Sequence, residues 1–485
     1  MATPYAISFF LYFLILLAIG LISHKRQTTS ADFIVGNRTL NFWLTALTAH
    51  ASDMSSWLFM AFPAALYIGG VPESWIALGL VFGMWCNWQF VAEKLRTQTE
   101  KYNSFTLSTF FERRFNDQSG IIRSLTAIMI LFFMTTYLSA GLITMGILLE
   151  SLFGVNYYVG LSFASLVVVI YTFAGGFITV AWTDFFQGMF LLLAIVIVPI
   201  LAYNQIGGMG PLVQAAQEYD ISLHLIKDYS WATLLQILFL AFSWGLGYFG
   251  QPHIVTKFIG IKNPNDIYKA KYLGMSWQIL TLGAAAFTGL IGIKFFNHGL
   301  ADPQLVFVEM VRTLFTPWIG GFILCGLVAA TMSTMDSQLL VSASVLSEDI
   351  YKHLLHKNAS PIRLLRASRI SVIIVALISL TVAFVKSATI MEVVQYAWSG
   401  LGASFAPVML MALYSKRTNR FGAIAGIFVG GFVAAIWPVI NPFVTQLNIP
   451  SMIPGFTLSL LTIRIVSLLT QRQTEHDKTY YPNNR

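Results

Sequence analysis

The chain has 485 residues, of which 56% are hydrophobic and only 10% are charged. A soluble domain carries about 25% charged residues, so this composition excludes a soluble fold of this length and indicates that lipid is the main solvent. The formal net charge of +8 does not indicate nucleic acid, because the basic residues lie in short clusters between apolar runs and do not follow one stripe.

The first apolar run, residues 5–23, is predicted to be an uncleaved membrane span. A signal peptide begins with a basic segment, whereas here His24, Lys25 and Arg26 follow the apolar run. This order places the N-terminus outside the cell.

Thirteen apolar runs are long enough to cross a membrane, which takes roughly 20 residues. We expect spans near residues 5–23, 42–67, 71–92, 121–149, 156–176, 180–203, 231–256, 271–296, 316–346, 368–385, 389–414, 421–440 and 450–471.

The Lys and Arg residues test this topology, since cytoplasmic loops carry most of the positive charge. With an external N-terminus, 25 of the 29 Lys and Arg residues fall in the cytoplasmic loops, their flanks and the C-terminal segment, and the external ones are Lys227, Lys294, Arg312 and Lys386. The cytoplasmic set includes Lys257, which we assign to the flank of the loop after span 7. We therefore predict an all-α polytopic protein of the cell inner membrane, with thirteen spans, an external N-terminus and a cytoplasmic C-terminus.

No soluble domain is expected. Residues 1–473 are predicted to form one integral-membrane domain and residues 474–485 a polar cytoplasmic tail, while the polar stretches near 93–120, 204–230 and 347–367 are loops that contain short amphipathic helices. Cys86 and Cys325 lie inside apolar runs without a CxxC spacing, so we interpret both as buried thiols with no metal or disulfide role.

Span 2 is interrupted by polar residues between His50 and Trp57. Asp53 and three serines compete with the helical backbone for hydrogen bonds, which favours local unwinding. Unwinding frees backbone carbonyls, which are hard oxygen ligands suited to an alkali cation. The alternative is a polar patch whose hydrogen bonds are satisfied within the helix bundle.

Early in span 6, Asp184 is a carboxylate inside an apolar run, and ionisable residues in a span are functional candidates because they are costly in hydrocarbon. The alternative is an acidic residue in the first helical turn, where it favours the helix macrodipole.

Span 7 contains a literal GxGxxG at Gly245, Gly247 and Gly250. We reject a dinucleotide site, because no βαβ unit surrounds the motif and Pro252 breaks the helix that should follow. Three glycines and a proline instead predict a broken helix, and Trp244, Tyr248 and Phe249 supply aromatic walls beside it for a small ligand.

In span 9, Ser333, Asp336 and Ser337 share one helical face at i, i+3 and i+4. Hydroxyls and a carboxylate on one stripe form an oxygen cage for a cation; the alternative is ordinary Ser/Thr packing between helices.

The breaks in spans 2 and 7 stand at corresponding positions, each in the first span of a set of five, spans 2–6 and 7–11. Paired breaks indicate a transporter built from an inverted repeat, of the LeuT-like kind, with its site at the membrane midplane.

Six blocks stand in order along nearly the whole chain: ASDMSSW (51–57), PESWIALGL (72–80), GGFITVAWTD (175–184), WGLGYFGQPHI (244–254), STMDSQLL (333–340) and YAWSGLGASFAPV (396–408). In these blocks the chain resembles the sodium/solute symporter family, and within it the bacterial sodium/proline symporters. The resemblance implies secondary active transport: sodium-coupled uptake of a small amino acid, L-proline first, by alternating access, with sodium as the co-transported ion.

The resemblance also implies site residues. The main sodium site would lie between spans 2 and 9, at the carbonyls of Ala51, Met54 and Ala330 and the hydroxyls of Ser333 and Thr334. The implied substrate pocket consists of Ser55, Ser56, Trp57, Tyr137, Trp244, Tyr248 and Pro252.

Charged residues are implied as well. Asp53 matches a carboxylate needed for sodium-coupled uptake, and Asp184 matches one linked to sodium coupling or to a second sodium site in some members. Arg38 and Arg369 match cytoplasmic-side arginines that affect transport.

Two positions depart from the pattern of the proline symporters. Ser56 stands where they usually have Gly, which narrows the pocket or adds a hydrogen-bond donor, and Asp336 stands where they usually have a small residue. Our hypothesis is that Asp336 and Asp184, with Ser333 and Ser337, form a second cation site or a protonatable pair.

Other functions stay open. The nearest alternative is another substrate, such as a different amino acid, a monocarboxylate, pantothenate or a sugar; next come a non-transporting membrane sensor and a channel. An enzyme is not expected, because no nucleophile–base set and no Cys/His metal cluster is apparent. The expected partners are the substrate, sodium and the lipid bilayer, with no nucleic acid and no obligate protein partner.

Overall fold

The computed structural model describes residues 2–23, 30–297, 299–385, 388–445 and 447–471. Within these ranges the chain is helical, and the one β-type pairing is a parallel bridge between Leu40 and Ile261. The predicted tail at 474–485, the basic residues Lys25 and Arg26, and Lys386 lie outside the described residues.

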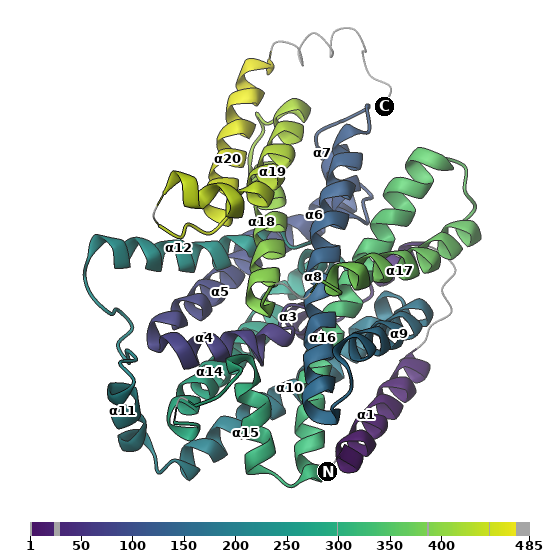
Figure 1. Cartoon of the computed structure of the whole chain (residues 1–485). Coiled ribbons are helices and arrows are strands. Elements are labelled where there is room, and N and C mark those ends of the chain that lie inside the picture. The colour runs from purple at the N-terminus through teal and green to yellow at the C-terminus, as the bar shows by residue number, and fades with distance from the viewer. Residues whose placement is uncertain (1, 24–29, 298, 386–387, 446, 472–485) are drawn as a thin grey trace.

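The α-helices follow one another along the chain (Figure 1). Their bounds are α1 (Ala2–Ser23), α2 (Ser30–Val35), α3 (Phe42–Ala51), α4 (Ala61–Gly69), α5 (Trp75–Cys86), α6 (Glu93–Lys101), α7 (Leu107–Arg114), α8 (Ile121–Phe153), α9 (Tyr157–Gly175), α10 (Phe177–Gln205), α11 (Met209–Glu218), α12 (Trp231–Gly247), α13 (Pro252–Ile259), α14 (Ile267–Phe295), α15 (Val306–Leu314), α16 (Pro317–Ser344), α17 (Pro361–Ala383), α18 (Ile390–Tyr414), α19 (Arg420–Val444) and α20 (Met452–Leu469).

The helices account for the predicted spans. Ten helical segments of the described chain are long and apolar enough to cross a membrane. Three shorter apolar helices, Thr3–Ile19, Ser56–Gly69 and Tyr157–Ile170, overlap the remaining predicted spans, which are spans 1, 2 and 5. The predicted short helices in the polar stretches are α6, α7 and α11, and Figure 1 places α6 and α7 at one end of the bundle and α11 and α15 at the other, near the N-terminus.

Span 2 is broken as predicted. Asn41 caps α3 by accepting a hydrogen bond from the Leu44 N–H at 2.9 Å, and α3 then ends at Ala51. A 3₁₀ turn at Ser56–Leu58 follows, and α4 begins only at Ala61. The backbone from Ser52 to Ser55 is therefore irregular at membrane depth, which a bilayer tolerates only inside a protein.

Span 7 is broken as well. After α12 a 3₁₀ turn covers Tyr248–Gly250, Gln251 is extended, and α13 begins at Pro252. Gly250 is required because a Cβ atom there would lie 2.7 Å from the Ala406 amide nitrogen. Our interpretation that Pro252 breaks the following helix was wrong: a proline at the first helical position loses no intrahelical bond and has the right φ, so Pro252 starts the second half-helix.

The two breaks meet in the centre of the bundle. α13 packs against α3, the span 7 break packs against α18, and α10 packs along α16, α14 and α3. In Figure 1, α16, α8 and α10 form the middle of the molecule, while α19 and α20 lie together at one side. Each broken helix opens a set of five spans, which is the arrangement expected of an inverted repeat.

Candidate functional site

The first feature of the site is a cluster of oxygens where the span 2 break meets α16. The Ser333 hydroxyl donates to the carbonyl oxygens of Ala51 at 2.8 Å and Ala330 at 3.1 Å, and the Thr334 hydroxyl lies 3.5 and 3.2 Å from the same two oxygens. The Ala51 carbonyl points here because α3 ends at this residue, so no next helical turn takes its bond.

This cluster joins four of the five predicted sodium ligands. The fifth, Met54, lies buried in the same break and donates its N–H to the His50 carbonyl at 3.0 Å. Carbonyl and hydroxyl oxygens suit a hard monovalent cation. Sodium is such a cation, so the donor set fits it.

The second feature is an aromatic box beside the break. Trp57 of span 2 stacks on Trp244 of span 7, with ring centroids 5.7 Å apart. Trp398 of α18 closes the box: its ring lies 5.9 Å from Trp244 and edge-on to Tyr248 at 5.0 Å, and its indole nitrogen donates to the Trp244 carbonyl at 3.1 Å. Such walls suit a small ligand with an apolar body.

The polar side of the box is the Asp53 carboxylate. Tyr248 donates its hydroxyl to Asp53 Oδ2 at 2.5 Å, and Gln278 donates its amide to the Tyr248 oxygen at 3.0 Å. The other oxygen, Asp53 Oδ1, has no hydrogen-bond partner although Asp53 is 1% exposed. A buried acceptor without a partner is costly, so this oxygen is available to a ligand donor.

The remaining predicted pocket residues surround the same point. The Ser56 hydroxyl accepts a bond from Thr144 of α8 at 2.8 Å. Tyr137, also on α8, meets the His253 ring edge-on at 5.7 Å, and its hydroxyl has no partner. Ser55 is buried and accepts from the Trp57 N–H, while Pro252 begins α13 next to His253.

The third feature is the cluster around Asp184. Its Oδ2 accepts hydrogen bonds from Thr48 of α3 and from Ser52, at 3.2 Å in the second case, and forms an ion pair with Lys257 at 3.1 Å. The charge pattern placed Lys257 in the flank of a loop, and that prediction was wrong. Lys257 lies in α13 and is 2% exposed. Asp184 is the eighth residue of α10, so the alternative of a first-turn acid on the macrodipole is excluded.

The span 9 residues lie beside this cluster. Ser337 shares a hydrogen bond of 2.8 Å with Ser52, and Asp336 accepts one from Thr172 of α9 at 3.0 Å. Asp336 Oδ2 and Asp184 Oδ1 have no partner. Ser52 directly follows Ala51, so a single residue links the oxygen cluster to the Asp184 cluster.

Several residues here were not predicted. Gln278, Trp398, Ser52, Thr48, Thr172 and Lys257 all contact predicted site residues. Trp398 stands in one of the six family blocks, which was its only signal. Ser52 stands in another of these blocks, at the predicted break of span 2, but its contacts to other helices were not predicted. Thr48 and Lys257 lie on half-helices of the two broken spans, outside the six blocks, and Thr172 and Gln278 come from helices without a break or a motif.

The two predicted cytoplasmic-side arginines are not part of the box. Arg38 donates to the carbonyls of Thr99 and Ser104, each at 3.0 Å, and so ties the segment before α3 to α6 and to the loop that follows it. Arg369 lies over the Phe173 ring at 5.7 Å.

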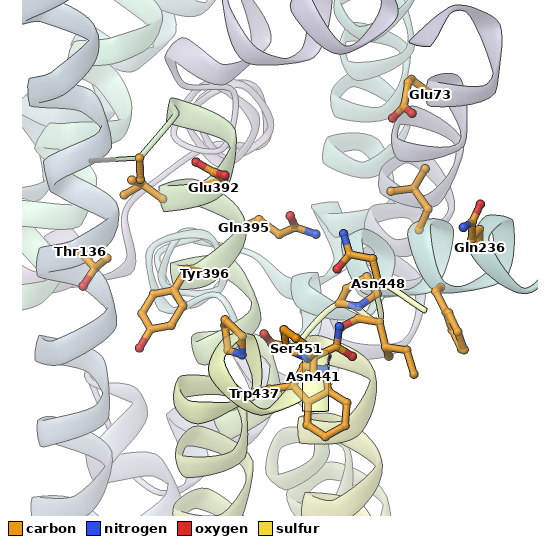
Figure 2. A pocket seen from close by; sticks show the side chains of 18 of the residues that line it. Glu73, Thr136, Gln236, Glu392, Gln395, Tyr396, Trp437, Asn441, Asn448 and Ser451 are labelled. Atoms are coloured by element: carbon orange, nitrogen blue, oxygen red, sulfur yellow. Dashed lines mark hydrogen bonds between the residues drawn. The ribbon is translucent and has the colours of Figure 1, made fainter. Parts of the chain in front are cut away.

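A large cavity of about 1240 Å³ opens between α8, α12 and α18 at the end of the bundle that carries α11. Figure 2 shows Glu392 and Thr136 on one side, Glu73 and Gln236 on the other, and Gln395 between them. Thr136 and Ser139 belong to its lining and flank Tyr137 in sequence, so the cavity reaches the level of the aromatic box.

Toward the opposite end the cavity among the described residues is small. A cavity of only about 10 Å³ lies among Pro252, Thr256, Phe105, Ile130 and Ser344, and that is room for one water molecule at most. Among the described residues the wide approach to the site is from the end with α11, which we call the open end, and we call the other the closed end.

Known proteins share both the sequence and the fold. A model of the sodium:solute symporter family matches residues 33–430. The chain is 42% identical over 466 residues to the high-affinity proline transporter PutP of Bacillus subtilis, covering 95% of this chain and 97% of that one. It is 37% identical over 477 residues to the sodium/proline symporter of Escherichia coli, covering 96% and 93%.

Among solved structures, a substrate-bound, outward-open Na⁺-coupled sialic acid symporter superposes with a TM-score of 0.80 at 19% identity, over 96% of this chain and 98% of that one. Mhp1, a nucleobase-cation-symport-1 family transporter in a closed conformation, gives 0.57 at 15% identity, over 92% and 96%. At these identities the structures establish the fold alone, which is the predicted inverted-repeat transporter fold.

Proposed function

The chain belongs to the sodium:solute symporter family, and from this we propose that it takes up L-proline together with sodium. It is a multi-pass membrane transporter and no enzyme, and sodium is its co-transported ion. Proline is our choice because the relatives at 37–42% identity over nearly their whole length are proline transporters.

One observation carries this proposal: the span 2 break takes part in both the oxygen cluster and the aromatic box. The Ala51 carbonyl lies in the oxygen cluster with Ser333, while Asp53, two residues later, faces Tyr248 in the aromatic box. Sodium bound by Ala51, Met54, Ala330, Ser333 and Thr334 would fix the same backbone that presents Asp53, Ser55 and Ser56 to the substrate. Each ligand then lowers the ordering cost of the other, which is positive coupling.

The box supports a small cyclic amino acid. Trp57, Trp244 and Tyr248 would pack against the pyrrolidine ring, and the groups of the span 2 break, with the free oxygen of Asp53, would take the charged ends. The hydroxyl of Ser56, the departure from the proline pattern, is held by Thr144. This hydroxyl therefore adds little polar character to the pocket.

Asp184, Asp336 and Ser337 would couple this site to the rest of the core, since Ser52 bonds both Asp184 and Ser337. The free energy comes from the sodium gradient, about 2.3 kcal/mol per charge per 100 mV plus the concentration ratio.

We propose the cell inner membrane as the location, with the N-terminus outside. The support is the Lys and Arg distribution: without the buried Lys257, 24 of the 29 residues remain on the predicted cytoplasmic side. In that orientation the 1240 Å³ cavity faces outward and the closed end faces the cytoplasm.

Uptake of labelled L-proline into proteoliposomes, with and without an inward sodium gradient, tests the function. We expect accumulation that needs sodium and collapses when the gradient is dissipated. Ser333→Ala should raise the sodium concentration needed for half-maximal uptake by about tenfold or more, since it removes a ligand. Ser344→Ala on the same helix, whose hydroxyl bonds only the Leu340 carbonyl, is the matched control.

Sodium-dependent uptake of a different amino acid or of a monocarboxylate, with no proline uptake by the folded protein, would replace the proposed substrate. Proline uptake that is indifferent to sodium would overturn the proposed coupling.

A further inference from the structure

The Asp184 cluster is built like a cation site. Two carboxylates, Asp184 and Asp336, and the hydroxyls of Thr48, Ser52 and Ser337 lie together, and each of these residues is at most 2% exposed. Asp336 is within electrostatic reach of both Asp184 and Lys257. Oxygen donors of this kind take a hard monovalent cation, and one oxygen of each carboxylate has no partner.

A cation is already present in this cluster, because the chain supplies it. The Lys257 ammonium lies 3.1 Å from Asp184 Oδ2, and its other side faces the Phe177 ring at 5.2 Å. Burying an ammonium ion costs several kcal/mol unless it is paired. Lys257 is 2% exposed, so its place is determined by the carboxylate.

An ammonium group resembles sodium in what matters here: it is a compact, strongly hydrated point charge of +1. One Lys257 charge offsets the Asp184 charge, and a sodium ion entering the same cluster would meet that charge at close range.

We propose that Lys257 is a tethered cation that occupies the place of a second sodium ion, so that this protein couples transport to one sodium per substrate. The inference rests on the proposed sodium-coupled function and deepens it. Lys257 is a positioning residue: it touches neither the substrate box nor the Ala51–Ser333 cluster, and it acts through Asp184 and Ser52.

The tether also gives the pair a mechanical role. Lys257 belongs to α13, the half-helix that begins at Pro252 below the substrate box, whereas Asp184 belongs to α10. Ser52 bonds Asp184 and follows the sodium ligand Ala51. An ion bound at Ala51 thus steadies the pair that holds α13, while a free second sodium would lack this link to span 7.

Sodium titrations of the purified full-length protein, followed by intrinsic tryptophan fluorescence without proline, test the proposal. The wild type should give a Hill coefficient of about one, and Lys257→Met, which keeps the length but removes the charge, should give a steeper titration approaching two sites. Lys257→Arg should stay near one, because the charge is retained. Lys257→Met/Asp184→Asn should also stay near one, because both the tethered cation and its carboxylate are gone.

Transport gives the second readout. In proteoliposomes with the membrane potential clamped at zero, the proline gradient that stops net flux should follow the first power of the sodium ratio in the wild type and approach its square in Lys257→Met.

Three results would contradict part of this account. A first-power dependence and an unchanged Hill coefficient in Lys257→Met would overturn the proposal. If Lys257→Met binds no sodium at any concentration while the double variant does, the Asp184 cluster must be electrically neutral but binds no sodium ion. In that case the Lys257–Asp184 pair has only a structural role, and the proposal is overturned. Wild-type protein that binds sodium but moves no proline would overturn the proposed substrate and leave the fluorescence result standing.

Discussion

The two ends of the bundle are held together in different ways. At the end with α6 and α7, charged groups cross between helices: Arg123 of α8 pairs with Asp349 at 2.8 Å, and Asp349 also accepts from Ser108 of α7 at 2.5 Å. At the end with α11 and α15, the described ion pair of Arg312 with Glu309 lies within one helix, and neutral bonds such as that from the Ile390 N–H to Gln304 join the elements.

The two ends also differ in the volume of their cavities. The cavity described at the first end measures about 10 Å³, and the cavity described at the second end about 1240 Å³. Charged contacts that are buried and paired hold a closed end strongly, because removing one partner is costly, whereas neutral, wetter contacts separate at little cost. In the orientation that we propose, opening toward the cytoplasm therefore requires breaking the charged contacts, and their strength sets how rarely the empty carrier opens in that direction.

The largest effect is expected from Asp349→Asn. Asp349 is fully buried, and loss of its charge leaves Arg123 only the longer 3.5 Å ion pair with Glu112, which costs up to about 3–5 kcal/mol. The closed state of this end should weaken enough to give sustained opening, with loss of proline accumulation. Thiol labelling from the cytoplasmic side, at Ser344→Cys in a protein whose Cys86 and Cys325 are replaced by alanine, measures the opening.

Glu348→Gln is the matched control for this change. Glu348 pairs only with Lys352 one turn away, and Lys352 is 40% exposed, so the pair is worth a few tenths of a kcal/mol. Equal labelling in both variants would show that the charged contacts do not hold this end closed.

Arg96→Ala should have an intermediate effect. Arg96 is buried and donates to the carbonyls of Ile261 at 2.7 Å and Lys262 at 3.3 Å. Ile261 forms the bridge to Leu40, so this arginine fixes the point where the two broken spans meet at the end with α6 and α7. Hydrogen bonds from a charged donor are worth about 1.5–3 kcal/mol, and we expect about a tenfold rise in the same thiol labelling.

Glu100→Gln provides the comparison for Arg96. It removes the 2.7 Å ion pair of Arg96 but leaves both backbone bonds, and Glu100 is 58% exposed. Labelling as high as in Arg96→Ala would place the effect in the ion pair and not in the bridge.

The sequence predicted the spans and both breaks because these depend on local composition. Pro252 acts on its own backbone, and Asp53 with its serines competes with its own helix. Lys257 was misplaced for the opposite reason. Charge counting treats every lysine beside a loop as solvated, and only the packing of α13 against α3 and the position of Asp184 on α10 show that this one is buried.

The hydrogen bonds that Thr48, Ser52 and Thr172 form with other helices were not predicted for the same reason. A serine or threonine in a span usually bonds its own helix four residues back, and Ser52 does donate to the Thr48 carbonyl at 2.5 Å. Its further bonds to Asp184 and Ser337 depend on two other helices, which no pattern in span 2 specifies.

At the open end, Gln395→Ala should change little. Gln395 lines the large cavity and points toward its middle (Figure 2), where water can replace its hydrogen bonds. We expect the apparent affinity for proline to change by less than about threefold, a difference of under 1 kcal/mol. A larger loss in uptake assays would mean that the cavity binds substrate on its way in and is more than a passage.

The smallest expected effect is a pH dependence of the closed end through Glu112 of α7. Burial raises the pKa of Glu112 above its usual value, although Arg123, 3.5 Å away, opposes the shift; His353 lies 3.9 Å away on another side. Because the raised pKa belongs to the folded, closed state, protonation of Glu112 stabilises that state, and the stabilisation is lost as the pH rises through the folded pKa. Cytoplasmic labelling of Ser344→Cys should therefore increase modestly from pH 5 to pH 7.5, and Glu112→Gln should remove that part of the slope, whereas Glu309→Gln at the open end should retain it. If Glu112→Gln leaves the slope intact, the pH response of this end belongs to another group of the network, and the closed state gains nothing from protonation of α7.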